Sequence, residues 1–242
     1  LKMNGCLSSI CELVDAITTR SKNFHDCDVV ILPPYLYLNE VSLLLEKSHL
    51  SLGSQNICQF NNGSYTGEIS AQMISELGCD YVLIGHSERR NFFLETNNHI
   101  LEKVKRALEN NLTPILCVGE TEEENKNDQT KDVLKRQLEV IKDIEFNDSL
   151  VIAYEPVWAI GTGNTPTPDK INEIHKFIKD VVQSFSVNSA IPMVLYGGSV
   201  NQENADNFFK EEFVDGALIG GASLDGRQFA NIINIFNGIN FK

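Results

Sequence analysis

The chain alternates between two hydrophobic patterns along its whole length. Short runs of apolar and β-branched residues, which are typical of buried strands, recur seven times, at 28–32, 50–53, 81–84, 113–118, 150–154, 193–196 and 217–219. Between them lie segments with apolar residues at helical spacing, such as Ile171, Ile174 and Ile178. Because this alternation runs without a linker or a shift in composition, we predict one α/β domain over residues 1–242, with a parallel sheet.

The spacing of the strands narrows the fold class. Strand starts lie about 31 residues apart, the size of one strand–helix unit, and eight such units in about 250 residues close a (β/α)8 barrel. The chain begins with a loop and a helix expected at 8–19, whose preceding strand would lie before Leu1. We therefore predict a (β/α)8 barrel that lacks its first N-terminal β-strand in this sequence. A doubly wound open sheet is the alternative, but the glycine-rich dinucleotide motif that usually accompanies it is absent.

Two predicted helices have recognisable start signals. Thr167 is expected to cap a helix that continues with Pro168 and Asp169, a proline and an acidic residue in the first turn. The last helix is expected to begin within Ser223-Leu224-Asp225.

Composition and charge exclude several partners. The chain has 20 Lys and Arg against 33 Asp and Glu, a net charge of −13 that disfavours nucleic acid and anionic membranes as partners. No apolar run approaches the ~20 residues of a membrane span, and the first residues do not form a signal peptide. The six cysteines have no C-x-x-C pair, so we expect a reduced, intracellular setting. Because the chain as a whole repels anions, an anionic substrate would have to be bound by a local lysine or by helix N-termini.

Polar residues and glycines gather where the predicted strands end, which is where parallel barrels carry their reactive groups. They are Lys2, Gln55, Asn56, His86 to Arg90, Gly119, Glu120, Glu155, Gly197, Gly198, Ser199, Gly220 and Gly221. The five histidines lack the usual metal-binding spacings, and no P-loop is present, so we predict neither a metal nor a nucleotide cofactor.

Glu155 and His86 each allow two interpretations. Glu155 ends an apolar run before Pro156, and it is either a partly desolvated general base or a carboxylate paired with a nearby arginine. His86 is either a turn residue or, at the start of a short helix, a neutral hydrogen-bond donor to a carbonyl oxygen. In the second case Glu88 is a supporting neighbour that pairs with Lys2.

The glycine pairs and the loop after Glu155 also allow two interpretations. Gly197-Gly198 and Gly220-Gly221 either serve left-handed turns or bring backbone N–H groups to a phosphate at helix N-termini. The apolar loop is either packed over the barrel rim or a lid, with Trp158 anchoring one hinge, that expels water from Glu155. Its residues are Pro156, Val157, Trp158, Ala159, Ile160, Gly161, Thr162 and Gly163.

Several of these segments together resemble the triosephosphate isomerase family. The matching segments are residues 2–5, 63–68, 84–90, 153–163, 196–200 and 219–224, which follow in the family's order from the first residue to the last helix. The resemblance implies a TIM barrel that interconverts dihydroxyacetone phosphate and D-glyceraldehyde 3-phosphate through an enediolate, without a cofactor, in glycolysis and gluconeogenesis. It also implies a cytoplasmic enzyme, or a plastid one if a transit peptide was removed.

The resemblance implies a role for each site residue. Glu155 moves the proton, neutral His86 polarises the carbonyl, Lys2 neutralises charge on substrate and transition state, and Glu88 supports the site. Phosphate binding falls to backbone N–H groups, with Lys2 beside them, at Gly161, Ser199, Gly220 and Gly221. The excursion 58–67 and the neighbouring Glu68 resemble an arm that enters a second subunit, so we expect a homodimer with contacts from Tyr65, Thr66 and Glu68.

The chain departs from the family's motifs at its first residues and in the hinge of the lid. The family's Asn before the lysine would lie ahead of Leu1, which itself stands where an aromatic residue is usual, and Pro166 stands in the far hinge of the lid. We expect about ten further residues before Leu1 in the natural protein, enough for one strand. The alternatives to an active isomerase are a truncated, catalytically impaired barrel that acts as a phosphate-binding or interaction protein, and a different phosphate-binding barrel enzyme.

Overall fold

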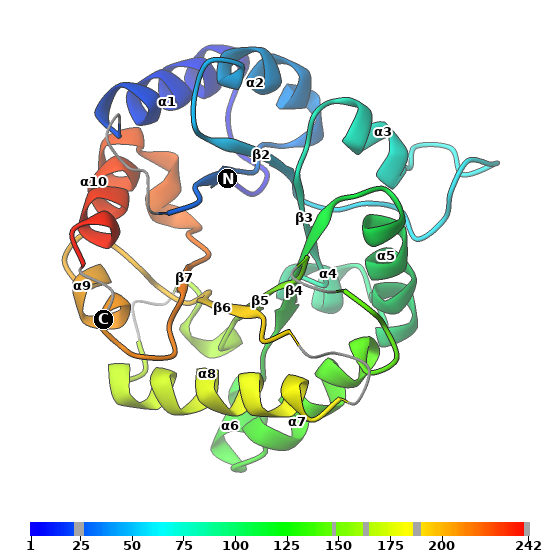
Figure 1. Ribbon diagram of the computed structural model, residues 1–242, viewed down its shortest axis with the longest axis vertical. Coiled ribbons are helices and arrows are strands. Elements are labelled where there is room, and N and C mark those ends of the chain that lie inside the picture. Colours follow the sequence, from blue (N-terminus) through cyan, green and yellow to red (C-terminus); the bar gives the residue numbers. More distant parts are fainter. Residues whose placement is uncertain (22–26, 147–148, 162–164, 186–189, 240–242) are drawn as a thin grey trace.

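The framework of the fold is a curled sheet of seven parallel strands. The structure, a computed structural model, describes residues 1–21, 27–146, 149–161, 165–185 and 190–239. The strands are hydrogen-bonded in chain order and the helices lie outside them (Figure 1). They are β1 (Val30–Ile31), β2 (Ser51–Ser54), β3 (Tyr81–Ile84), β4 (Thr113–Val118), β5 (Val151–Tyr154), β6 (Met193–Tyr196) and β7 (Gly216–Ala217). This arrangement confirms the predicted TIM-barrel class.

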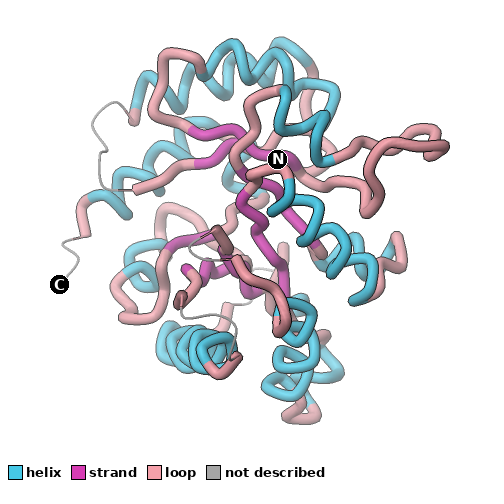
Figure 2. The backbone as a smooth tube through the Cα atoms, turned by 45° about the vertical axis from the view of Figure 1, so that its right-hand side comes forward, coloured by secondary structure: helices cyan, strands magenta, loops and turns pink. Residues whose placement is uncertain are grey.

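Helices surround the sheet because each strand returns to the next one through a helix on the outside, as Figure 2 shows. The α-helices are α1 (Leu7–Arg20), α2 (Leu38–Leu45), α3 (Ala71–Glu76), α4 (Ser87–Phe92), α5 (Asn97–Glu109), α6 (Glu122–Lys126), α7 (Thr130–Leu138), α8 (Pro168–Gln183), α9 (Ala205–Phe209) and α10 (Gly226–Asn237). Short 3₁₀ helices are η1 (Tyr35–Tyr37), η2 (Glu139–Ile141), η3 (Val157–Ala159) and η4 (Gly221–Leu224). No helix in the described part of the chain is long and apolar enough to cross a membrane.

The strand register brings the carboxyl ends of the strands to one edge. Val118 of β4 lies opposite Tyr154 of β5, which lies opposite Tyr196 of β6. Apolar residues are buried on both faces of the sheet, since one cluster packs against the helices and a smaller one, including Ile115 and Ala153, lies inside the curl. The residues that follow these strand ends are therefore neighbours.

The two outer strands, β1 and β7, are not paired with each other in the described residues. A cavity of about 1510 Å³ borders both of them, and its lining includes apolar side chains such as Ile17, Ile31 and Ile232 as well as charged ones such as Asp28 and Lys210. The gap lies where the spacing of the sequence predicted a missing strand.

The starts of two helices agree with the signals in the sequence. The Thr167 side chain caps α8 by accepting the backbone N–H of Lys170, as predicted. Asp225, the last residue of the predicted start, caps α10, while Ser223 lies in η4 and its hydroxyl donates to the carbonyl of Gly220.

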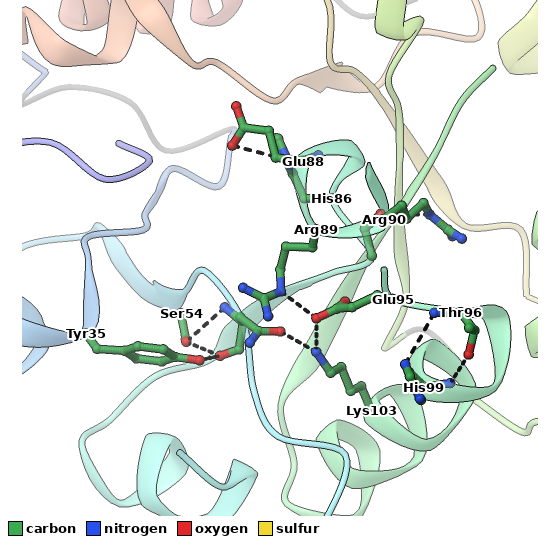
Figure 3. A network of polar contacts seen from close by, with 12 residues as sticks. Tyr35, Ser54, His86, Glu88, Arg89, Arg90, Glu95, Thr96, His99 and Lys103 are labelled. Carbon is green, nitrogen blue, oxygen red and sulfur yellow. Dashed lines mark hydrogen bonds and ion pairs between the residues drawn. The ribbon is translucent and has the colours of Figure 1, made fainter. Parts of the chain in front are cut away.

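A buried polar cluster, formed by Asn56, Arg89, Glu95 and Lys103, joins α4 and α5 to the end of β2. Lys103 is 5% exposed, and its Nζ donates to Glu95 and to Asn56 Oδ1. Arg89 also donates to Glu95, and in Figure 3 it reaches from α4 toward this pair while Glu88 points away from it. Burial alone would raise the pKa of Glu95, but Lys103 and Arg89 outweigh it and hold this pKa below its usual value.

The cluster generates a stability prediction. Replacing Lys103→Met removes one of the two cations that pair with the buried Glu95 carboxylate, so we expect the free energy of unfolding to fall by about 3 kcal/mol. The matched control is Lys105→Met on the same helix, whose exposed pair with Glu102 should contribute less than about 1 kcal/mol. Urea denaturation at one protein concentration measures both. Equal losses in the two variants would contradict a stabilising role for the cluster.

Candidate active site

Glu155 stands at the centre of the site, immediately after β5. Its side chain is 2% exposed, Oε2 accepts the backbone N–H of Ser87 at 2.9 Å, and Oε1 lies 3.0 Å from His86 Nε2. A Cβ at position 197 would lie 2.8 Å from Glu155 Cγ, so Gly197 makes room for this side chain. The alternative expectation, an ion pair with arginine, does not occur among the described residues.

His86 is held in one tautomer by the start of α4. It is the N-cap residue of this helix, and its Nδ1 accepts the backbone N–H of Glu88 at 3.2 Å. Because an accepting Nδ1 carries no proton, the proton lies on Nε2, which donates to Glu155. The ring therefore presents Nε2 as a donor beside the carboxylate, and it stands at the start of a short helix, the position that the second interpretation requires.

Lys2 forms the predicted ion pair with Glu88, at 2.5 Å. Its backbone is in the left-handed region at φ 51, and its carbonyl accepts the Gln55 side-chain amide at 3.0 Å. Lys2 also borders the loop after β7, since its Cε lies 3.6 Å from where a Cβ on Gly220 would be. The ammonium group thus lies between the His86 side of the site and the second glycine pair.

The glycine pairs do not serve left-handed turns. None of Gly197, Gly198, Gly220 and Gly221 has a positive φ, so that alternative is wrong. A Cβ at Gly198 would collide with the Tyr196 hydroxyl, whereas one at Gly221 would meet nothing within 4 Å. The first pair is needed for close packing, and the second leaves open space where η4 begins.

The predicted lid is described only as far as Gly161, and Thr162 and Gly163 lie outside the described residues. Val157–Ala159 form η3, and Gly161 is exposed with φ +68, a conformation that favours glycine. The Ser199 hydroxyl donates to the carbonyl of Ala159 at 2.7 Å. The start of the loop is therefore tied to the segment after β6.

The predicted arm, residues 58–67, extends away from the body of the molecule between β2 and α3 (Figure 1). Tyr65 is 42% exposed and stacks on Phe60, with ring centroids 4.3 Å apart. Thr66 and Glu68 are exposed as well.

Sequence reasoning assigned no role to three groups that shape the site. They are the Ser87 backbone N–H, the Gln55 side chain and the buried Glu120. Gln55 and Glu120 had a signal, because both follow predicted strands. The Ser87 donor had none, since every residue except proline carries a backbone N–H.

The arrangement suits proton transfer next to a carbonyl group. A desolvated carboxylate can accept a proton from carbon, while a neutral N–H donor and an ammonium group stabilise negative charge on oxygen. Among the described residues, no group of three or more His, Cys, Asp or Glu side chains is placed to hold a metal ion.

Comparison with known proteins agrees with this chemistry. The family model described as triosephosphate isomerase matches residues 1–236. A triosephosphate isomerase of Nitrosomonas europaea is 44% identical over 235 residues, covering 96% of this chain and 93% of the relative. Those of Legionella pneumophila strain Paris and Alkaliphilus metalliredigens are 42% and 43% identical, covering 98% and 96% of this chain and 96% of each relative. The chain belongs to the triosephosphate isomerase family.

Proposed function

We infer that Glu155 is the base with which this isomerase interconverts dihydroxyacetone phosphate and D-glyceraldehyde 3-phosphate. The observation that carries this inference is the contact of the buried Glu155 carboxylate with His86 Nε2 at 3.0 Å. A carboxylate beside a hydrogen-bond donor can take a proton from the carbon next to a carbonyl while the donor holds the carbonyl oxygen. No observation favours the truncated, impaired binding protein.

The proton moves between neighbouring carbons in two steps. Glu155 takes the proton from the carbon beside the carbonyl, the C–H electrons form a carbon–carbon double bond, and the carbonyl oxygen becomes the enediolate oxygen. Glu155 then returns the proton to the adjacent carbon. His86 Nε2 donates to the substrate oxygens and exchanges protons between them, so Glu155 must release His86 when substrate is present.

The phosphate of the substrate is bound by groups close to it, because the net charge of −13 on the whole chain repels an anion. Lys2 lies beside Glu88 and the Gly220 loop, where its ammonium group can face both the enediolate and the phosphate. We propose that backbone N–H groups at Gly161, Ser199, Gly220 and Gly221 bind the phosphate, and that Pro156 to Gly163 close over it. Glu88 holds Lys2 in place.

We also propose a homodimer and a cytoplasmic location, both implied by the family. Exposed apolar side chains lie on the arm, at Phe60 and Tyr65, and at the end of α4 and just beyond it, at Phe92, Phe93 and Leu94. They are 41–78% exposed and would be covered in a dimer. The substrates place the enzyme in glycolysis and gluconeogenesis.

The role of Glu155 is tested by Glu155→Gln. The amide keeps the shape of the side chain but cannot accept the proton, so we expect kcat to fall by ~10² or more while substrate still binds. The control Glu203→Gln changes an exposed carboxylate and should leave kcat unchanged. Steady-state kinetics in both directions measures this, and a Glu155→Gln enzyme with near-parental kcat would refute the assignment.

A second prediction concerns Pro166 near the end of the proposed lid. Proline restricts its own φ and the conformation of Thr165, and relieving such a restriction is worth about 0.4–1 kcal/mol, or roughly 2- to 5-fold in an equilibrium. If Pro166 limits lid motion, Pro166→Ala should change kcat and KM together by about this factor. Pro168→Ala, at the first position of α8, is the matched control and should change stability alone.

The dimer is tested at the arm. Tyr65→Asp places a charge where an aromatic side chain is expected to be buried against a second copy, so we expect the dimer to dissociate at micromolar concentration. Ile191→Asp, a change at another exposed apolar residue (54% exposed), should leave the dimer intact. Sedimentation velocity distinguishes the two states. If both variants keep the oligomeric state of the parent, the arm does not hold a second subunit.

A further inference from the structure

The buried carboxylate of Glu120 has no role in the mechanism above, yet it contacts the segment that carries Glu155. Glu120 follows β4 and is 0% exposed. The Tyr154 hydroxyl lies 3.2 and 3.1 Å from its two carboxylate oxygens, and Trp158 Nε1 donates to Oε1 at 2.9 Å. The backbone carbonyl of Glu120 accepts the N–H of Val157 at 3.1 Å. One residue thus receives hydrogen bonds from positions 154, 157 and 158, on both sides of Glu155.

Burial of the Glu120 carboxylate has a cost in free energy, because the charged group loses its contact with water. The Glu120 carboxylate is hydrogen-bonded by neutral groups, the Tyr154 hydroxyl, Trp158 Nε1 and the backbone N–H of Glu120 itself, and the nearby charge of Glu124 is of the same sign. Burial raises the pKa of Glu120. An apolar side chain of similar size would avoid the cost of desolvation but would leave both donors unpaired. What the carboxylate adds is therefore a defined position for Tyr154 and Trp158.

The end of β4 is also in close contact with Glu155 itself. The Glu155 N–H donates to the carbonyl of Val118 at 2.7 Å, and a Cβ at Gly119 would collide with the Glu155 carbonyl oxygen. Residues 118–120 therefore touch the chain before, at and after Glu155. Movement of Glu120 would change the backbone from which the Glu155 carboxylate extends.

We propose that Glu120 is a positioning residue for proton transfer, which holds the backbone on both sides of Glu155 through Tyr154, Val157 and Trp158. The proposal rests on the proposed role of Glu155 as the base. A displacement of about 1 Å at a reacting group can lower a rate by up to ~10². Lys2 and the Gly220 loop lie on other elements, so substrate binding should change less than the rate of proton transfer.

The test compares Glu120→Leu with Glu120→Gln. Leucine removes the acceptor, and we expect kcat to fall about 10-fold or more with KM changed less than about twofold. The kinetic isotope effect on kcat, measured as the ratio of the rates with dihydroxyacetone phosphate and with its C1-deuterated form, should rise. The reason is that a slower proton transfer limits the overall rate more strongly. Glutamine keeps one acceptor oxygen for Trp158, so kcat should return to within about threefold of the parent. Glu122→Gln, a change at an exposed carboxylate in α6, is the control and should match the parent.

Fluorescence provides an independent readout, because Trp158 is the chain's single tryptophan. We expect its emission maximum to shift in Glu120→Leu and not in Glu120→Gln. If Glu120→Leu does not fold, the double variant Tyr154→Phe with Trp158→Phe removes both side-chain donors and keeps an aromatic ring at each position, and its kcat should fall in the same way.

The outcomes separate this proposal from the proposed function. A folded Glu120→Leu or double variant with parental kcat would overturn the positioning role, even if Glu155→Gln is inactive. A raised KM at unchanged kcat would also overturn it, since the effect would then lie in substrate binding. An active Glu155→Gln enzyme would show that Glu155 is not the base, and this result does not depend on the role of Glu120.

Discussion

The site depends on the burial of one carboxylate. Glu155 is 2% exposed, and a buried anion is stable only where donors replace the water it has lost. The Ser87 backbone N–H and His86 Nε2 supply these donors, and both belong to the start of α4. The turn after β3 therefore has to meet the end of β5, and the parallel register of β3, β4 and β5 brings these ends to the same edge.

A second set of contacts holds these groups in place from outside the site. Arg89 connects α4 to the buried Glu95 and Lys103, while Glu88, one residue earlier, holds Lys2. A single short helix thus links the histidine, the lysine and a buried ion pair. On the other side of Glu155, Glu120 holds Tyr154 and Trp158. Buried polar groups that are hydrogen-bonded to one another favour one geometry, which proton transfer needs.

One ammonium group, that of Lys2, lies where the substrate is expected, although the chain as a whole is acidic. Lys2 lies between Glu88 and the Gly220 loop, and a Cβ on Gly221 would meet no atom within 4 Å beyond its chain neighbours. Backbone N–H groups and one ammonium group can bind an anion at short range, while the net charge of −13 acts only as a screened background. The acidic composition is therefore compatible with a phosphorylated substrate.

The sequence by itself determined the seven strands, their parallel order, the family and the residues that meet at the strand ends. Hydrophobic periodicity and motif residues are local properties, so residues such as Glu155 and His86 could be named without coordinates. Only the tertiary structure decided the partners. It showed that Gly197 makes room for Glu155, that Ser87 donates to it, and that Glu120 bonds to Tyr154 and Trp158. These contacts join residues that lie 34 to 68 positions apart in the sequence, and some of them use backbone atoms that nearly every residue has. The sequence pattern therefore does not show which residues meet, and the packing of the barrel decides it.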